Sequence, residues 1–369
     1  MTSEERREAR FRRRSAERQR RRDERSRSCG SFEQVFSFEH LYAAGRSCCK
    51  GVGWKCSTQR YMADIATNTA RTHEQLMDGK WKTRGFHEFT LMERGKLRHI
   101  RSVHISERVV QKCLCENVLV PVFSAAFIYD NAASLKNKGI DFAMDRLNCH
   151  LQRHYRKHGL EGGVLVYDFS DYFNSAPHAP IYRENDRRIT EERVRQIANG
   201  LMEDFGERGF GLGSQVSQID ALMLPNKLDH FIKEELHIEG AGRYMDDGYA
   251  IHHDIAYLKR CMEQIREKCR ELGLKLNEKK TRILKLTEMK FLKKKFILTQ
   301  TGRVIRKMNR KGTRKMREKL RKFKVWMEAG RMTMEDIRTA YESWRGHMRR
   351  GNSWRILRRM DRFYTRLFA

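Results

Sequence analysis

Residues 242–252 read GRYMDDGYAIH, and they predict a strand, a tight turn and a second strand. Asp and Gly favour hairpin turns, and apolar residues flank the Asp-Asp-Gly step. The other decisive stretch, residues 162–169, reads GGVLVYDF. A short, nearly continuous apolar run of this kind is typical of a buried strand. The first strand therefore ends at Asp168, and the hairpin turns at Asp246 and Asp247.

The segments around these strands predict a mixed fold. Residues 85–103 alternate apolar and polar side chains around Gly95 and predict a β-hairpin. Residues 106–120 predict a helix that Ser106 caps and Pro121 ends. Further helices are expected over 139–158, 190–205, 216–235, 255–272 and 308–369. Strand, helix, helix, hairpin and helix in this order indicate an α+β domain with an antiparallel sheet.

The charge of the chain points to a polyanionic partner. Its 77 Lys and Arg residues face 47 Asp and Glu residues, giving a formal net charge of +30. Nucleic acid is the usual partner of such a surplus, and a membrane surface is the second candidate. No apolar run of 18 residues exists, so no bilayer span is expected. Residues 1–30 are rich in arginine and are expected to form a disordered or partly helical arm, which either binds RNA or solubilises the chain.

The cysteines favour a reducing compartment. Nine cysteines are scattered along the chain at irregular spacing, and the N-terminus has no secretory signal. An odd number of cysteines argues for free thiols. The expected location is therefore cytoplasmic.

Three carboxylates, from separate strands, are candidates for metal chemistry. Nucleotidyl transfer uses two divalent cations roughly 4 Å apart, and Mg²⁺ prefers oxygen ligands. Asp168 ends the buried strand, and Asp246 and Asp247 lie 78 and 79 residues further on, in the hairpin turn. If the hairpin lies beside the buried strand, the three carboxylates meet. Each of them alone also has a purely local explanation, because Asp is common in turns.

Six motifs resemble those of reverse transcriptases, in the order of that family, across roughly residues 90–300. Residues 244–247, YMDD, match the Tyr-x-Asp-Asp box, and residues 166–173, VYDFSDYF, resemble the first acidic motif. The other four are the fingers motif in 97–111, the Gly-x-x-x-Ser-Gln signature of bacterial members in 213–218 (GSQVSQ), the LKLNEKKT motif in 274–281, and the primer-grip motif in 290–293 (KFLK).

The resemblance implies a right-hand polymerase fold with fingers, a palm that carries an antiparallel sheet, and a helical thumb. The expected domains are the basic arm, an N-terminal extension with the fingers, the palm and the thumb, over residues 1–30, 31–160, 161–300 and 301–369. The bacterial or phage members of the family, of the group II intron, retron and diversity-generating type, are the expected relatives.

The resemblance also implies roles for individual residues. Asp168, Asp246 and Asp247 would hold two Mg²⁺ ions with the backbone carbonyl of Phe169, and Mn²⁺ would be a substitute metal. The expected nucleotide-binding residues are Lys96, Arg98, Phe173, Gln218 and Lys280. Within this set, Phe173 would exclude the ribose 2′-OH, Lys96 and Arg98 would clamp the triphosphate, and Lys280 would protonate the pyrophosphate. The expected primer grip is Phe291, Leu292 and Lys293.

Simpler readings of some of these residues stay open. Lys96, Arg98 and Lys280 are also consistent with a solvated basic face, and Gln218 with a structural hydrogen bond. The sequence departs from the family pattern at His99 and Ser102, at Asn174, and in the charged run Lys293–Lys295. None of these departures removes a catalytic carboxylate.

The expected function is that of an RNA-directed DNA polymerase acting in a retroelement, a diversity-generating system or antiphage defence. Expected partners are an RNA template, a DNA or RNA primer, dNTPs and a dedicated non-coding RNA, with an accessory protein subunit as a further candidate. One alternative is an RNA-binding protein with little catalytic turnover. Another is an RNA-dependent RNA polymerase, which the aromatic Phe173 opposes.

Overall fold

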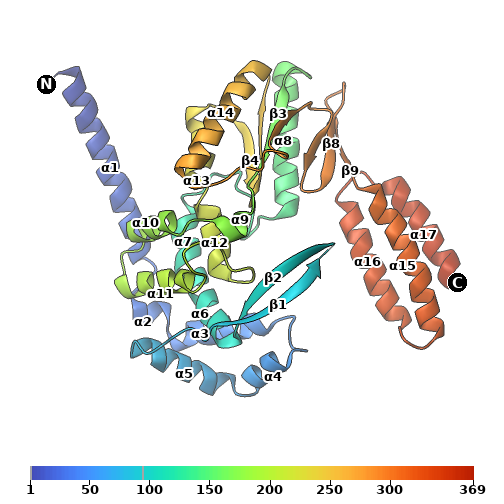
Figure 1. Ribbon diagram of the computed structural model, residues 1–369, viewed down its shortest axis with the longest axis horizontal. Helices are drawn as coiled ribbons and strands as arrows, with labels where there is room; N and C mark the ends of the chain where they lie inside the picture. Colours follow the sequence, from blue (N-terminus) through green and yellow to red (C-terminus); the bar gives the residue numbers. More distant parts are fainter. Residues whose placement is uncertain (1, 94) are drawn as a thin grey trace. The chain divides into compact units, whose positions relative to one another are not determined.

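The chain folds into two compact units that interleave along the sequence. The computed structural model describes residues 2–93 and 95–369, without the side chains of Glu93, Lys96, Arg98 and Arg310. Unit 1 comprises residues 1–136, 169–231 and 266–276, and unit 2 comprises 137–168, 232–265 and 277–369. Helices and strands of both units are labelled in Figure 1.

Unit 1 is mainly helical and carries one β-hairpin. Its N-terminal elements are α1 (Ser3–Arg27), α2 (Phe32–Val35), α3 (Phe38–Cys49), α4 (Cys56–Ala63), α5 (Ile65–Met77), β1 (Phe86–Glu93), β2 (Lys96–Val103), α6 (Ile105–Leu114), the π-helical turn η1 (Cys115–Leu119) and α7 (Val120–Ser124). Its later helices are α9 (Tyr172–Ser175), α10 (Ala179–Arg188), α11 (Glu192–Glu203), α12 (Gln215–Met223) and α13 (Asn226–His230). Strands β1 and β2 pair in antiparallel register from Phe86↔Val103 to Glu93↔Lys96, as the sequence predicts.

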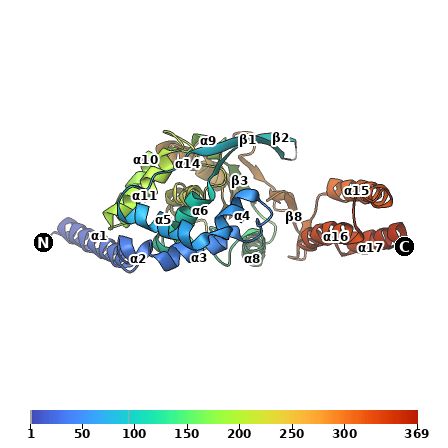
Figure 2. The same cartoon turned by 90° about the horizontal axis from the view of Figure 1, so that it is seen from below.

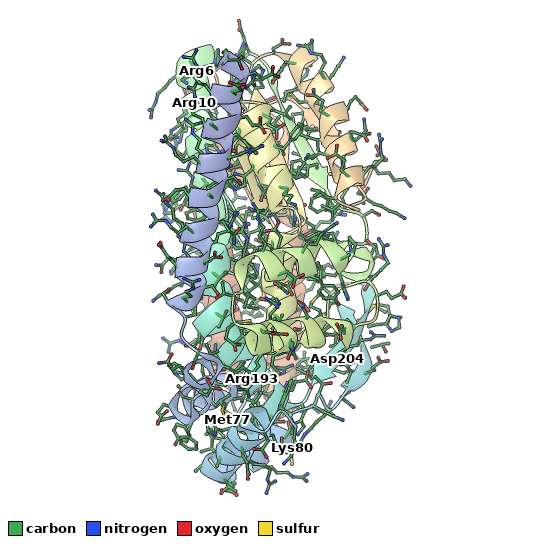
Figure 3. The ribbon with its side chains drawn as sticks, turned by 90° about the vertical axis from the view of Figure 1, so that its left-hand side faces the viewer. Arg6, Arg10, Met77, Lys80, Arg193 and Asp204 are labelled. Carbon is green, nitrogen blue, oxygen red and sulfur yellow. The ribbon has the colours of Figure 1, made fainter. Side chains whose placement is uncertain are left out.

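A shared apolar core and one arginine hold the first helices of unit 1 to α11. The core joins residues of α2, α3 and α5 to those of α6, α11 and α12. The guanidinium of Arg193 donates hydrogen bonds to the carbonyl oxygens of Leu76 and Met77, at 3.2 and 3.0 Å (Figure 3). It also lies 3.8 Å above the ring of Phe32 and forms an ion pair with Glu33. The α5 C-terminus is thereby capped from another helix.

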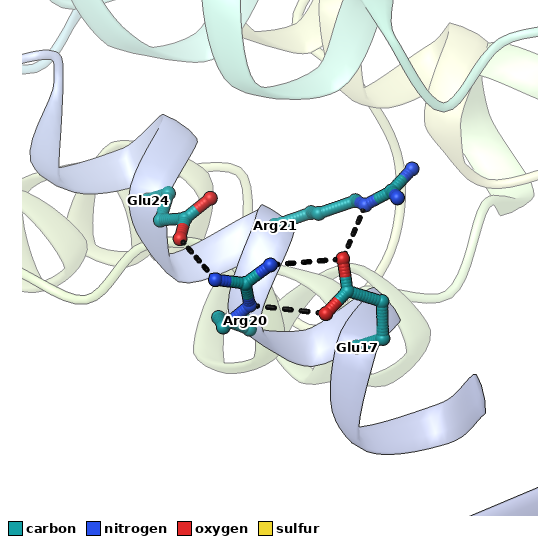
Figure 4. Close-up of polar contacts among 4 residues, drawn as sticks. All are labelled: Glu17, Arg20, Arg21 and Glu24. Atoms are coloured by element: carbon teal, nitrogen blue, oxygen red, sulfur yellow. Dashed lines mark hydrogen bonds and ion pairs between the residues drawn. The ribbon is translucent and has the colours of Figure 1, made fainter. Parts of the chain in front are cut away.

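Residues 3–27 form a continuous helix, α1, where a disordered or partly helical arm was expected. A capping box at Thr2 and Glu5 begins it. Glu17 bridges Arg20 and Arg21, and Arg20 also contacts Glu24 (Figure 4). Pairs spaced by three or four residues stabilise helices, and they offset the repulsion of the arginines here. The end of the helix is anchored, because the Ser26 hydroxyl accepts hydrogen bonds from Thr190.

Pro121 does not end the helix of residues 106–120, contrary to the sequence prediction. Helix α6 begins after His104, widens into η1 and continues as α7 with Pro121 in its first turn. A proline has no N–H and its ring clashes with the carbonyl four residues earlier. A π turn immediately before it removes both problems, since the wider turn has already changed the hydrogen-bond pattern.

Unit 2 is built on a four-stranded antiparallel sheet. Its elements are α8 (Ile140–His158), β3 (Gly163–Asp168), β4 (Gly240–Tyr244), β5 (Asp247–His252), β6 (Arg282–Leu284), β7 (Met289–Phe291), β8 (Lys294–Leu298), β9 (Val304–Lys307), α15 (Arg310–Glu328), α16 (Met334–Arg349) and α17 (Trp354–Phe368). The strand order is β4-β5-β3-β6. Helix α8 packs against β4 and β5. The π-helical turn η2 (Phe231–Glu235) and α14 (Ile255–Glu271) run across the boundary between the units.

A second sheet and three helices complete unit 2. The second sheet has the order β7-β8-β9 and is antiparallel throughout. Helices α15, α16 and α17 lie together and share a small core (Figure 2). Trp344 packs on that core, whereas Trp326 and Trp354 are exposed.

The expected α+β class with antiparallel sheets is confirmed. Across the described ranges, no helix is long and apolar enough to span a membrane. The expected domain boundaries stay predictions, because the two compact units divide the chain differently.

Candidate active site

The sheet of unit 2 brings the three candidate carboxylates together. Strands β3 and β5 pair in antiparallel register, and the last pair of that ladder is Asp168↔Asp247. Tyr244 pairs with Asp247 across the β4–β5 hairpin, so Met245 and Asp246 form its two-residue turn. Cα atoms of residues directly opposite each other are about 4.5–5.5 Å apart in such a ladder. The carboxylates therefore cluster at one end of the sheet.

The turn differs in detail from the sequence prediction, which assigned Asp-Asp-Gly to the turn. Asp247 and Gly248 lie in strand β5, and Gly248 pairs with Tyr167. A Cβ atom at Gly248 would lie within 3.0 Å of three atoms of the Tyr167 side chain. Real Cβ atoms essentially never approach another group so closely, so the glycine is required by the tyrosine rather than by the turn.

The turn itself is held by a buried arginine. Met245 has φ 52°, in the left-handed region that disfavours residues with a side chain. Arg243, only 1% exposed, donates a hydrogen bond of 2.8 Å from Nη1 to the carbonyl of Met245. Its charge also lowers the pKa of Asp246, opposing the effect of burial. Arg243 thus fixes the turn and partly neutralises it.

Burial and mutual repulsion disfavour the ionised form of the clustered carboxyl groups. Burial, then the charges of Asp246 and Asp168, raises the pKa of Asp247 to about 7. Burial and the charge of Asp168 also raise the pKa of Asp246. Like charges at one site disfavour simultaneous ionisation. The cluster would be relieved by a cation.

Lys280 is the cation that the structure provides. Its Nζ lies 2.7 Å from both carboxylate oxygens of Asp168. Burial lowers the pKa of Lys280, but Asp168, Asp247 and Asp246 outweigh that effect, so its pKa is raised. The backbone N–H of Asn277 donates to the carbonyl of Asp168 at 2.8 Å, and the turn after it carries Lys280 to the carboxylate.

The donor set fits a hard divalent cation. Its side-chain donors are all carboxylate oxygens, which Mg²⁺ prefers, and the raised pKa values of Asp246 and Asp247 mean that a cation would be stabilising. Within the described part of the chain, no three His, Cys, Asp or Glu side chains lie as a ready-made cage. At Asp168, both carboxylate oxygens instead accept hydrogen bonds from Lys280.

Two of the expected nucleotide-binding residues, Phe173 and Gln218, lie in unit 1. Phe173 packs edge-on against Tyr172 and Phe210, with ring centroids 5.6 and 5.9 Å away. The side chain of Gln218 is exposed and accepts a hydrogen bond from Ser134 at 3.3 Å, which is the structural reading that the sequence left open.

For three other expected residues, the backbone positions in the sheets and bridges are as follows. Phe169 forms an isolated antiparallel bridge with Leu276. Lys96 and Arg98 lie in β2, opposite Glu93 and Leu91, and their side chains fall outside the described residues.

The expected primer grip forms the tip of the β7–β8 hairpin. Phe291 pairs with Lys294, so Leu292 and Lys293 make a two-residue turn. Both have positive φ, 47° and 62°, as a type I′ turn requires, although Asn-Gly is the usual choice. Phe291 is buried against Tyr249, with ring centroids 5.1 Å apart. Lys293 is exposed and Lys294 is 5% exposed.

Sequence reasoning missed Arg243 and the fit between Tyr167 and Gly248. The available signal for Arg243 was a charged residue inside an otherwise apolar strand, directly before the acidic turn. Such a residue needs a buried partner, and the turn is the nearest one.

Comparisons with known proteins agree with this geometry. The family model described as "Reverse transcriptase (RNA-dependent DNA polymerase)" matches residues 87–295, more than half of the chain. No curated protein matches.

Two solved structures of a telomerase from Candida tropicalis are similar to the chain. The apo telomerase has 12% sequence identity and a TM-score of 0.48, covering 61% of this chain and 48% of that one. A form truncated from the C-terminal domain has 12% identity and a TM-score of 0.46, covering 60% of this chain and 55% of that one. This chain thus spans about half the length of the solved structures that it matches. By the family match, which includes all three clustered carboxylates, the chain belongs to the reverse transcriptase (RNA-dependent DNA polymerase) family.

Proposed function

We propose that this protein copies RNA into DNA by adding dNTPs to the 3′ end of a primer. The observation that supports this most is the pairing of Asp168 with Asp247 at the end of the sheet, with Asp246 in the adjacent turn. Family membership supports the same reaction. A purely structural role would not explain why two neighbouring carboxylates, Asp246 and Asp247, are held where burial and nearby negative charge raise their pKa values.

Asp168, Asp246 and Asp247 are the proposed metal ligands, together with the backbone carbonyl of Phe169. Two divalent cations, when bound, would activate the 3′-oxygen of the primer and neutralise the negative charge of the triphosphate. The chain contributes the fixed positions of the carboxylates, which the strand register and the Arg243 hydrogen bond to the turn provide.

Lys280 is the proposed general acid for the pyrophosphate. Its raised pKa keeps the ammonium protonated at neutral pH, so it has a proton to give. Its ion pair with Asp168 also holds that carboxylate in place before substrates arrive. The two roles are compatible because the side chain of Lys280 is 56% exposed and free to swing away.

The remaining site residues are proposed from the family pattern. Phe173 would lie under the sugar and exclude a 2′-OH, and Gln218 would contact the nucleotide or template. Lys96 and Arg98 would clamp the triphosphate, since a guanidinium suits phosphate. Phe291, Leu292 and Lys293 would hold the primer, with Lys293 exposed at the hairpin tip.

Primer extension on an RNA template tests the proposal. Wild-type protein with MgCl₂ and dNTPs should extend a labelled primer, and Asp246→Asn should reduce extension by at least about 10³-fold. Asp64→Asn is the matched control, because Asp64 is exposed and its side chain makes no cap hydrogen bond. Equal activity of Asp246→Asn and wild type would refute the assignment. RNA binding without any extension would favour the binding-protein alternative.

The sugar preference separates a DNA from an RNA polymerase. Phe173→Ala should increase rNTP incorporation relative to dNTP incorporation. An unchanged ratio in that variant, or a wild type that prefers rNTPs, would overturn the assignment of Phe173.

We also propose that the protein acts in the cytoplasm, in a bacterial or phage retroelement, diversity-generating or defence system, together with a dedicated non-coding RNA. The surplus of positive charge, +30, supports a large RNA partner. Sequencing the RNA that copurifies with the protein tests this: one enriched transcript is expected, and a random sample of cellular RNA would argue against it.

A further inference from the structure

Unit 2 carries a row of five aromatic rings that the polymerase site does not use. The rings of His158 and His253 are stacked, with centroids 4.2 Å apart and planes at 12°. His252 lies 4.4 Å from His253 and 4.7 Å from Tyr257. His154 extends the row at the other end, 5.4 Å from His158.

The row lies at the end of the sheet opposite the carboxylates. His252 pairs with Gly163 at one end of the β3–β5 ladder, and Asp247 pairs with Asp168 at the other. Five residues separate the two ends, which is about 17 Å along a strand. The row is therefore a separate feature of the palm sheet.

The four histidine rings of the row line an open cavity, together with cationic side chains. The cavity has a volume of about 340 Å³ and is also lined by Arg153, Arg156 and Lys157 from the last turns of α8. Lys157 forms a long ion pair with Glu239, in which Nζ lies 3.8 Å from Oε2. Over residues 2–93 and 95–369, neither Arg153 nor Arg156 has a hydrogen-bond or ion-pair partner. The size is in the range of small-ligand sites.

Two histidine rings of the row, those of His154 and His252, are held in place by hydrogen bonds to the backbone. Nε2 of His154 donates a 2.7 Å hydrogen bond to the carbonyl of Glu161, and Nδ1 of His252 accepts one of 3.1 Å from the backbone of Asp254. Burial, together with the neighbouring histidines, lowers the pKa of His154 and of His252. The lowered pKa values of His154 and His252 favour the neutral form of these two rings, and the arginines supply the positive charge.

A helix terminus alone does not explain this arrangement. Arg156, Lys157 and His158 suit the C-terminal end of α8, where cations offset the helix dipole. That role needs neither the stacking of His253, which comes from the segment after β5, nor an open cavity beside it. Stacked rings beside unpaired arginines are instead the pattern that recognises an unpaired base and its phosphate.

We propose that this cavity binds a nucleobase and the adjoining phosphate of single-stranded RNA. The base would stack on the row of histidine rings, and Arg153 and Arg156 would contact the phosphate. The site would bind RNA away from the catalytic carboxylates and would tether a strand to the back of the palm. The proposal stands on the cavity alone and does not depend on polymerase activity.

Photo-crosslinking of the full-length protein tests the site. The probe is a single-stranded oligouridine that carries one 5-iodouridine, and crosslinked peptides are identified by mass spectrometry. We expect crosslinks in residues 150–158 or 252–257. The double variant His158→Ala, His253→Ala should reduce them at least about 10-fold, while His253→Phe, which keeps a ring, should retain them.

Two further comparisons test the role of the arginines and the nature of the bound group. Arg153→Gln with Arg156→Gln should weaken the crosslink, and Arg13→Gln with Arg14→Gln, which removes the same charge from exposed positions on α1, should not. Inorganic phosphate at equal phosphate concentration, which carries the charge without a base, should not displace the probe. Displacement by inorganic phosphate, equal losses in the two arginine pairs, or crosslinks confined to other segments would each overturn the proposal.

The catalytic assay keeps the two proposals apart. Asp246→Asn should leave the crosslink unchanged, and His158→Ala, His253→Ala should still extend a short primed template. A crosslink lost in Asp246→Asn would assign the bound RNA to the polymerase cleft and overturn the second site, whatever the outcome for the proposed function.

Discussion

Replacing Gly248 by alanine should damage the catalytic sheet through one defined clash. The new Cβ would lie within 3.0 Å of three atoms of the Tyr167 side chain. Tyr167 is 3% exposed and belongs to the neighbouring strand, so it has little room to move. The two strands carry Asp168 and Asp247, and any shift between them moves one carboxylate relative to the other.

The size of the effect follows from the crowding. Inserting a methyl group into a well-packed core costs about 1–3 kcal/mol, and a contact this short belongs at the upper end, about 3 kcal/mol. For a unit of roughly 150–250 residues, 1 kcal/mol shifts the unfolding midpoint by about 2–4 °C. Gly248→Ala should therefore lower the midpoint of unit 2 by about 6–12 °C and reduce primer extension with it.

A double-mutant cycle with Tyr167→Ala identifies the cause. Tyr167→Ala alone removes a buried ring and should cost about 3–5 kcal/mol. If the clash is the mechanism, the double variant should lose less free energy of unfolding than the sum of the losses of the two single variants. The difference should be about 2 kcal/mol or more. Gly346→Ala is the control, since its Cβ meets nothing and an alanine inside α16 should stabilise by about 0.5–1 kcal/mol. Strict additivity in the cycle would refute the reasoning.

Further predictions concern charge and the two turns. Asp220 is buried, its pKa is raised by burial to about 8, and over the described residues neither of its oxygens has a partner. Only the unfolded chain loses this proton between about pH 4 and 8, so the free energy of unfolding should fall as pH rises through that window. Asp220→Asn should remove this pH dependence, as measured by urea titrations at about pH 5 and 8. Met245→Gly should relieve the positive φ and raise the midpoint by about 2–4 °C, seen by calorimetry. Leu292→Asn with Lys293→Gly should stabilise the β7–β8 turn but raise the KM for primer–template in steady-state extension. Lys280→Ala should lower kcat about 10²-fold or more with little change in the KM for dNTP, and an unchanged kcat would exclude proton donation.

Three of the four strands of the catalytic sheet, β3, β4 and β5, were predictable because their patterns are local, whereas β6 was not predicted. An apolar run bounded by glycines predicts β3, and alternation around a short polar turn predicts the β4–β5 and β1–β2 hairpins. The structure has all of them within a residue or two of the predicted ends. Motif spacing also predicted that the carboxylates would meet, and strand register brings them to the same end of the sheet.

Other features depend on contacts that no local pattern encodes. The helix of residues 106–120 runs on through Pro121 because a π turn precedes the proline, and no sequence rule specifies that turn. The arm forms a helix because glutamates fall three and four residues from arginines, a pattern that the overall charge concealed. The need for glycine at position 248 depends on Tyr167, which lies 81 residues away in the sequence.

The strained positions identify which side chains matter most at the two hairpin tips. Met245, Leu292 and Lys293 all have positive φ, where a left-handed conformation costs roughly 1–2 kcal/mol for a residue with a Cβ. Glycine or asparagine would form both turns at lower cost. The strain at Met245 is opposed by the hydrogen bond from Arg243, so the catalytic turn is held in place by its own strand. At the β7–β8 tip Lys293 is exposed, and the same strain there has no packing benefit to offset it. The side chain itself must then be what the turn presents, which is why its replacement should affect primer use more than stability.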